Sequence, residues 1–132
     1  MSAQATGTFS VSGWDESTYQ EIEGGGKLTK AHVTFGFDGD LVGEGDWEAL
    51  MCYRADGAAD FTGYQRTTGS LAGKKGSFVL RADGTFEGGE ARTSWHVVEG
   101  SATGDLVGLR GTGLAVSTGG PGGTFTFDYE LG

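Results

Sequence analysis

The stretch WEALMCYRADGAADFTGYQ, residues 47–65, alternates apolar and polar side chains on both sides of the short sequence Ala55-Asp56-Gly57. Alternation at a period of two is typical of β-strands, and a three-residue loop that ends in glycine is a common hairpin connection. With this loop, the apolar face pairs Tyr53 with Ala59, Met51 with Phe61, Ala49 with Gly63 and Trp47 with Gln65. The other face pairs Asp46 with Arg66 and Glu48 with Tyr64. The stretch therefore predicts an antiparallel hairpin with one buried face and one solvated face.

The tetrapeptide Arg-Ala-Asp-Gly occurs a second time, at residues 81–84, again between two alternating runs. The same loop at this position pairs Leu80 with Phe86 and places Phe78 across from Gly88. We therefore interpret both copies of the tetrapeptide as hairpin loops of the same type.

The whole chain shows the same character, with 27 glycines, a single proline and no clean helical period in its 132 residues. Glycine without a period of three marks turns, bulges and corners between strands. The predicted strands cover residues 5–12, 28–38, 42–54, 58–68, 75–81, 85–98, 102–117 with interruptions, and 123–131. The last strand follows a glycine turn at 119–123 and is expected to pair with the first. We predict a single all-β domain over residues 1–132, a small closed antiparallel barrel of about eight strands with almost no helix.

One segment departs from the alternation. Residues 14–23 mix aromatic and acidic side chains without a period and end at Gly24-Gly25-Gly26. We expect this segment to be a flap or covering loop, close to the mouth of the barrel.

Charge and cysteine content exclude several classes of partner. The formal net charge of −9 would repel nucleic acid and anionic membrane surfaces, and no apolar stretch approaches the roughly 20 residues that cross a bilayer. Cys52 is the one cysteine, and residues 1–6 lack the basic and apolar regions of a signal peptide. We therefore expect a cytoplasmic protein with no nucleic-acid or membrane partner.

Residues 100–113, GSATGDLVGLRGTG, resemble a glycine-rich segment of the allene oxide cyclase and dirigent barrels. They are more similar still to a bacterial family of unknown function with the same barrel fold, although Ala102 stands where that family has glycine. Further matching pieces are ATGTF at 5–9, GSFVL at 76–80, GTF at 84–86, Trp95 and FDYEL at 127–131. The resemblance implies the barrel fold. It assigns no catalytic residue, because none of the plant cyclases' catalytic motifs matches this chain.

The predicted alternation places most apolar side chains on the inner face of the strands and gives the barrel lumen an apolar lining. We expect it to contain Phe9, Val11, Val33, Phe35, Phe37, Trp47, Met51, Tyr53, Phe61, Gln65, Phe78, Leu80, Phe86, Trp95, Phe125, Phe127 and Tyr129. The candidate ligand-binding residues are Trp47, Met51, Tyr53, Phe61, Gln65, Phe78, Trp95, Phe127 and Tyr129. Tyr53, Gln65 and Tyr129 are the catalytic candidates, since a few polar groups in an apolar cavity are typical of a small-molecule site. A core packed solid with side chains is the alternative.

Other side chains give weaker indications. His32 and His96 lie on the polar faces of their strands, and Cys52 has no activating neighbour in the sequence. Glu44, Asp46 and Glu48 form an acidic row that we interpret as solvated beside Arg66. We therefore expect no metal and no cofactor.

Three functions remain open at this point. The barrel could be a cofactor-independent cyclase or isomerase that folds an apolar substrate, or a carrier of a small hydrophobic molecule without chemistry. A self-associating structural barrel, as a dimer or trimer, is the third alternative. The presence of a cavity of a few hundred cubic ångströms separates the first two from the third.

Overall fold

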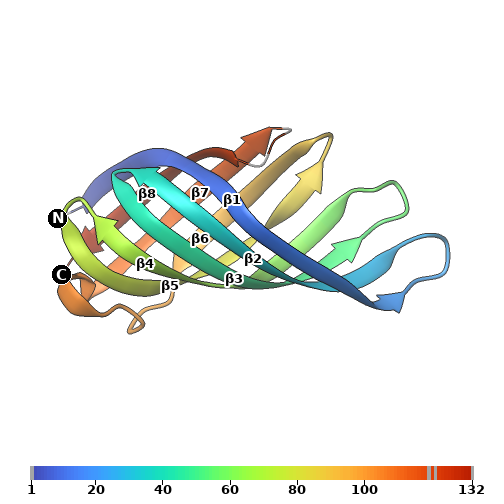
Figure 1. Cartoon of the computed structure of the whole chain (residues 1–132), viewed down its shortest axis with the longest axis horizontal. Helices are drawn as coiled ribbons and strands as arrows, with labels where there is room; N and C mark the ends of the chain where they lie inside the picture. Colours follow the sequence, from blue (N-terminus) through green and yellow to red (C-terminus); the bar gives the residue numbers. More distant parts are fainter. Residues whose placement is uncertain (1, 119, 121, 132) are drawn as a thin grey trace.

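The computed structural model describes residues 2–118, 120 and 122–131 as a closed barrel in which each strand pairs antiparallel with the next (Figure 1). The elements in chain order are β1 (Ser2–Glu21), β2 (Lys27–Gly39), β3 (Leu41–Tyr53), β4 (Ala59–Leu71), β5 (Lys74–Glu87), β6 (Glu90–Val97), the 3-10 turn η1 (Gly104–Leu106), β7 (Leu109–Thr118) and β8 (Gly122–Leu131). β8 pairs with β1 from Ser2↔Glu130 to Ser10↔Gly122, which closes the sheet as predicted. The predicted fold class is confirmed. The predicted turn at 119–123 includes positions 119 and 121, which lie outside the described residues.

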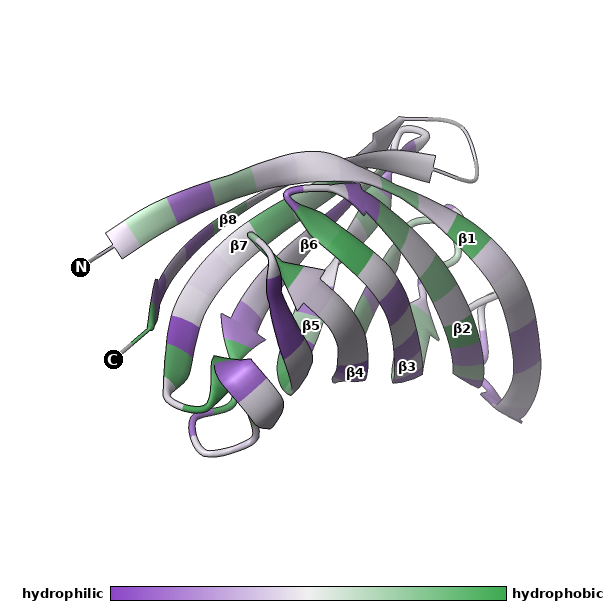
Figure 2. Cartoon of the chain, turned by 60° about the vertical axis from the view of Figure 1, so that its left-hand side comes forward, coloured by the Kyte–Doolittle hydropathy of each residue, from purple (hydrophilic) through white to green (hydrophobic). Residues whose placement is uncertain are grey.

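Alternation of side chains produces the two surfaces of the barrel. Along β3, buried and exposed residues alternate from Gly45 to Met51, and Figure 2 shows the matching apolar and polar bands along the strands. The register of β3 and β4 is the predicted one, with Tyr53 opposite Ala59, Met51 opposite Phe61 and Trp47 opposite Gln65. The hairpin at residues 47–65 is therefore confirmed in loop and register.

The second predicted hairpin is wrong. β5 continues through residues 81–84 and pairs with β4 from Leu71↔Lys74 to Ala59↔Phe86, so Leu80 lies opposite Gln65 and not Phe86. Phe78 lies opposite Thr67 and not Gly88. The chain turns instead at Gly88 and Gly89, whose φ angles are 63° and 80°. Two consecutive residues with positive φ form the tight connection preferred by twisted hairpins, so the predicted strand 85–98 is divided between β5 and β6.

The segment that we expected to be a flap is part of β1. Residues 13–21 pair with β2, and register shifts occur between Val11 and Gly13 and between Thr18 and Gln20. The first shift is a bulge at Ser12, which reverses the alternation. Phe9 and Val11 face the lumen before the bulge, and Trp14 and Glu16, opposite Val33 and Ala31, follow it on the same face.

Residues 98–108 close one end of the barrel. They replace the first part of the predicted strand 102–117, because β7 begins only at Leu109. Ser101 Oγ accepts from the Val79 amide at 3.0 Å, and the Thr103 amide donates to the Ser77 carbonyl at 2.8 Å. These bonds hold η1 against β5, where Leu106 is fully buried. We call this the closed end; its apolar residues are Leu41, Leu71, Leu106 and Leu109, and both chain termini lie beside it (Figure 1).

The opposite end carries the β1–β2, β3–β4 and β5–β6 turns and is uneven. β8 reaches only as far as Ser10 of β1, so the rest of β1 pairs with β2 alone and its other edge is free among the described residues. The β1–β2 hairpin accordingly extends beyond its neighbours (Figure 1).

Candidate functional site

The open end of the barrel contains an apolar cavity of about 570 Å³, which we call the cup. Its walls come from seven strands and from the turns between them. The lining residues are Phe9, Val11, Trp14, Phe35, Trp47, Met51, Tyr53, Ala59, Phe61, Phe86, Gly89, Ala91, Thr93, Ala115, Ser117 and Gly120. Among the residues that the structure describes, no charged side chain occurs in this lining, and a cavity of this size and composition is typical of small-molecule sites.

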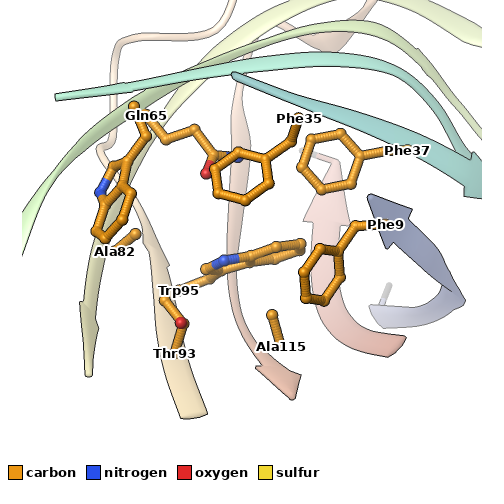
Figure 3. A pocket seen from close by; sticks show the side chains of 9 residues that line it. Phe9, Phe35, Phe37, Gln65, Ala82, Thr93, Trp95 and Ala115 are labelled. Carbon is orange, nitrogen blue, oxygen red and sulfur yellow. The ribbon is translucent and has the colours of Figure 1, made fainter. Parts of the chain in front are cut away.

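Below the cup lies a small cavity of about 40 Å³, the inner void. Gln65, Trp95, Phe37 and Ala82 line it, together with Phe9, Phe35, Trp47, Thr93 and Ala115, which the cup shares. Figure 3 shows the Gln65 side chain reaching toward Phe35 and Trp95 across this space. The Gln65 amide nitrogen donates to Thr67 Oγ1 at 3.1 Å, a bond between two buried side chains. The shared residues mark the depth at which the cup narrows into the inner void.

The nine candidate ligand-binding residues separate into two groups. Trp47, Met51, Tyr53 and Phe61 line the cup, while Gln65 and Trp95 line the inner void. Phe78, Phe127 and Tyr129 line neither cavity: Phe78 stacks on Phe127 with ring centroids 6.0 Å apart, and Phe127 stacks on Tyr129 at 5.5 Å. A packed core therefore fills the half of the lumen nearer the closed end, and a cavity occupies the other half.

The catalytic candidates are not brought together. Tyr53 lies at the mouth of the cup and Gln65 in the inner void, whereas Tyr129 borders a shallow groove beside Ser2 and Arg110 at the other end. A shared role for the three side chains in one reaction has no support in this arrangement.

Glu16, which the sequence analysis missed, is the common hydrogen-bond acceptor of the polar groups at the rim of the cup. Its carboxylate accepts hydrogen bonds from Trp14 Nε1 at 2.9 Å, Thr29 Oγ1 at 2.5 Å and the Tyr53 hydroxyl at 2.8 Å. The Lys27 ammonium lies 5.1 Å from the centre of the Tyr53 ring. Extending the alternation of residues 5–12 places Glu16 on the outer face, because it takes no account of the bulge at Ser12, which reverses the two faces of the strand. The sequence signal for this bulge was Ser12-Gly13, two small residues between alternating runs.

These contacts set the ionisation of both groups. Burial raises the pKa of Glu16, but the hydrogen bonds from Thr29, Tyr53 and Trp14 and the charge of Lys27 outweigh it, so the pKa is lowered. Burial, the hydrogen bond to Glu16 and the charge of Glu16 raise the pKa of Tyr53 to about 12. At neutral pH Glu16 is therefore a carboxylate and Tyr53 a phenol whose proton is directed to Glu16.

The weaker candidates lie on the outer surface. His32 bonds to Asp46, so Asp46 pairs with His32 and not with Arg66, its cross-strand neighbour. Cys52 is half-buried opposite Asp60. Among the described residues no group of three or more His, Cys, Asp or Glu side chains could hold a metal ion. In the same part of the chain, no helix has the length and apolar character needed to cross a membrane.

Fold and cavity together define the class: a small antiparallel β-barrel that is packed and sealed at one end and hollow at the other. Within that class the chain belongs to the family described as protein of unknown function (DUF3224), whose model matches residues 5–129. This confirms the resemblance to a family of unknown function. A comparison with curated proteins finds no match.

A solved structure supports the assignment. The crystal structure of a DUF3224 protein of unknown function from Shewanella oneidensis MR-1 is 28% identical in sequence, covering 100% of this chain and 99% of that one. Its TM-score of 0.84 shows that the two barrels share their architecture along the whole length.

Proposed function

We propose that the cup binds one small, mostly apolar molecule. The observation that supports the proposal is the cavity of about 570 Å³ with apolar walls, which remains where alternating aromatic residues could have filled the barrel. Trp47, Met51, Tyr53 and Phe61 provide the contact surface, and Trp14 and Phe86 lie at the rim. Phe86 is 41% exposed although it is a large apolar side chain, as expected of a wall that a ligand would cover.

Charge narrows the class of partner. The formal net charge of −9 disfavours anions, nucleic acid and anionic membranes, and the proposed partner is a small hydrophobic molecule. A reducing cytoplasm is the compartment that suits the single unpaired Cys52.

Storage or transport fits the polar groups better than catalysis does. A cyclase or isomerase like the allene oxide cyclases would need a donor directed at developing oxygen charge, and Tyr53 was our first candidate. Its proton is already donated to the Glu16 carboxylate. A carrier needs only the apolar walls, so we favour binding without chemistry and propose no cofactor.

Binding can be tested with a matched pair of variants on β6. Ala91 lines the cup, and Arg92, the next residue, is exposed on the outer surface. We expect N-phenyl-1-naphthylamine, a neutral hydrophobic probe, to bind at about one site per chain and to quench tryptophan emission. Ala91→Phe fills the cup and should weaken binding at least tenfold, whereas Arg92→Phe should leave it within about twofold.

The same titration can contradict the proposal. Circular dichroism and urea unfolding establish that both variants fold. Equal affinities of Ala91→Phe and the unmodified protein, or equal losses in the two variants, would show that the probe binds elsewhere.

A further inference from the structure

The side of the cup formed by β6 and β7 consists of small side chains. Three cross-strand pairs of inward-facing positions follow one another toward the closed end: Ala91 with Ser117, Thr93 with Ala115, and Trp95 with Gly113. Successive pairs are two residues apart, or about 7 Å along the strands. The first pair lines only the cup, the second lines both the cup and the inner void, and Trp95 lines only the inner void. The pair Thr93–Ala115 therefore marks the inner end of the cup, and we call it the floor pair.

The pair below the floor pair shows how the packed half of the lumen is filled. Gly113 has no side chain, and the ring of its partner occupies the space in front of it, because a Cβ on Gly113 would lie 3.1 Å from Trp95. In the floor pair both side chains are small, so neither fills the space that the other leaves, and the two cavities adjoin at this depth. Unfilled apolar space costs packing energy. The opening at the floor pair therefore favours an occupant other than the chain itself.

Aromatic rings limit the width of the cup at the same depth. Phe9, Phe35 and Trp47 line both cavities from β1, β2 and β3. The ring centroids are 6.0 Å apart for Phe9 and Phe35 and 6.3 Å apart for Phe35 and Trp47. At this depth the space falls from about 570 Å³ in the cup to about 40 Å³ in the inner void, which has room for a small group only. The cavity is therefore broad near its mouth and narrow at the floor pair.

We propose that Thr93 and Ala115 are specificity-determining residues of the cup, and that they select an uncharged ligand with a slender, unbranched apolar tail at the floor pair and a broader ring nearer the mouth. The inference rests on the proposed function and specifies its ligand class. The taper of the cavity accounts for the slender tail, and the apolar walls account for its character. A larger side chain at the floor pair would shorten the space for the tail, and a branched tail would overlap the rings that face it.

A series of 4-n-alkylphenols, from 4-ethylphenol to 4-n-octylphenol, measures how far a tail reaches into the cup. These compounds are neutral at pH 7 and combine one ring with one unbranched tail. Their affinities are obtained by displacement of N-phenyl-1-naphthylamine. Each added methylene group should tighten binding about fourfold until the tail meets the floor pair, and the gain should then stop. We call the last tail length that still gains affinity the limiting length.

The same substitution at two depths tests the floor pair. Ala115→Val adds two methyl groups at the floor and should shorten the limiting length by at least one carbon. Ala91→Val adds the same groups nearer the mouth, so it should weaken the whole series by a similar factor and leave the limiting length unchanged. Thr93→Ala removes atoms from the floor and should lengthen the limiting length by at least one carbon. Circular dichroism establishes folding, and Thr93→Ala still decides if Ala115→Val does not fold.

Two isomers test the width of the cup at the floor pair. 4-tert-Octylphenol has the composition of 4-n-octylphenol but a branched tail. The unmodified protein should bind the branched isomer at least tenfold more weakly, because its tail cannot pass between the floor pair and the facing rings without overlap.

The failure of this inference is distinguishable from that of the proposed function. The same limiting length in the unmodified protein, Ala115→Val and Thr93→Ala, or equal affinities of the two isomers, overturns the inference and leaves the cup as a hydrophobic site without selection at its floor. The inference also fails if the naphthylamine probe binds and no alkylphenol displaces it. Absence of binding by the probe itself overturns both.

Discussion

Individual glycines on the inner surface make space for aromatic rings of the neighbouring strand. A Cβ on Gly113 would lie 3.1 Å from Trp95 and 3.2 Å from Phe127, and a Cβ on Gly84 would lie 2.9 Å from the Phe61 ring. At Gly84 the carbonyl oxygen of Arg92 is nearer still, at 1.9 Å, so backbone as well as side chain would have to move. The shape of the core thus depends on residues that have no side chain.

Gly84→Ala tests this dependence. We expect the free energy of unfolding to fall by about 2 kcal/mol or more, because a methyl group would overlap the β6 backbone and Phe61. Gly36→Ala is the control: the nearest atom to its Cβ is Ser10 Oγ at 3.8 Å, so stability should stay unchanged or rise by up to about 0.5 kcal/mol. Urea unfolding measures both, and equal effects would contradict the packing argument.

His32 gives the stability a pH dependence. The hydrogen bond to Asp46 raises the pKa of His32 in the folded protein, desolvation opposes this rise, and the charges of Asp46, Glu48 and Asp15 add to it. Because the folded pKa is above the unfolded one, this contribution is fully present below about pH 6.5 and is lost as the pH rises through the folded pKa.

We therefore expect the unmodified protein to lose more stability between pH 6 and pH 9 than His32→Gln does. His96→Gln, which removes the other histidine, should retain the larger loss. Urea unfolding at the two pH values gives the comparison, and the same loss in His32→Gln as in the unmodified protein would show that the Asp46 contact does not stabilise the fold.

At the scale of elements, the two Arg-Ala-Asp-Gly sequences show how far local sequence determines structure. In the first copy Gly57 has a φ of 89° and Asp56 Oδ1 accepts from the Ala58 amide at 2.9 Å, so the predicted loop forms. In the second copy the same residues continue a strand, because β5 must pair along the full length of β4 and Gly88-Gly89 offers a tighter turn after it. Strand number and lumen face were predictable from alternation, whereas this turn depends on the length of a partner strand.

The site was predictable to a similar extent. The lumen-facing side chains of Trp47, Met51 and Phe61 follow from the register of one hairpin, which the sequence specifies. The position of Glu16 on the lumen side could not be predicted in this way, because a single bulged residue reverses the face of the second half of β1. The division of the lumen into a packed half and an open half also escaped prediction, since it depends on how residues 98–108 fold back against β5.

Leu106 anchors residues 98–108 to the barrel, and removal of its side chain should destabilise the fold. Leu106→Ala is expected to lower the free energy of unfolding by about 3 kcal/mol, because the side chain is fully buried among the leucines of the closed end. Val107, the next residue, is 67% exposed, so Val107→Ala should change stability by less than about 0.5 kcal/mol. Similar effects of the two substitutions in urea unfolding would show that η1 does not seal the barrel.

At the scale of the whole molecule, the free edge of β1 bears on self-association. An unpaired strand edge can add a strand from another chain. Residues 11–21 include Asp15, Glu16 and Glu21 and no basic side chain, so two copies joined along this edge would bring carboxylates together. The charge of the edge opposes the structural alternative in which the barrel functions by pairing with itself.

The closed end also has a kinetic meaning for the proposed ligand. In a barrel that is closed at one end, a molecule enters and leaves by the same opening. Its residence time is then set by its contacts with the walls of the cup together with the rings at the rim. Such a cavity suits the binding of one molecule at a time with slow release better than rapid passage of molecules through the protein.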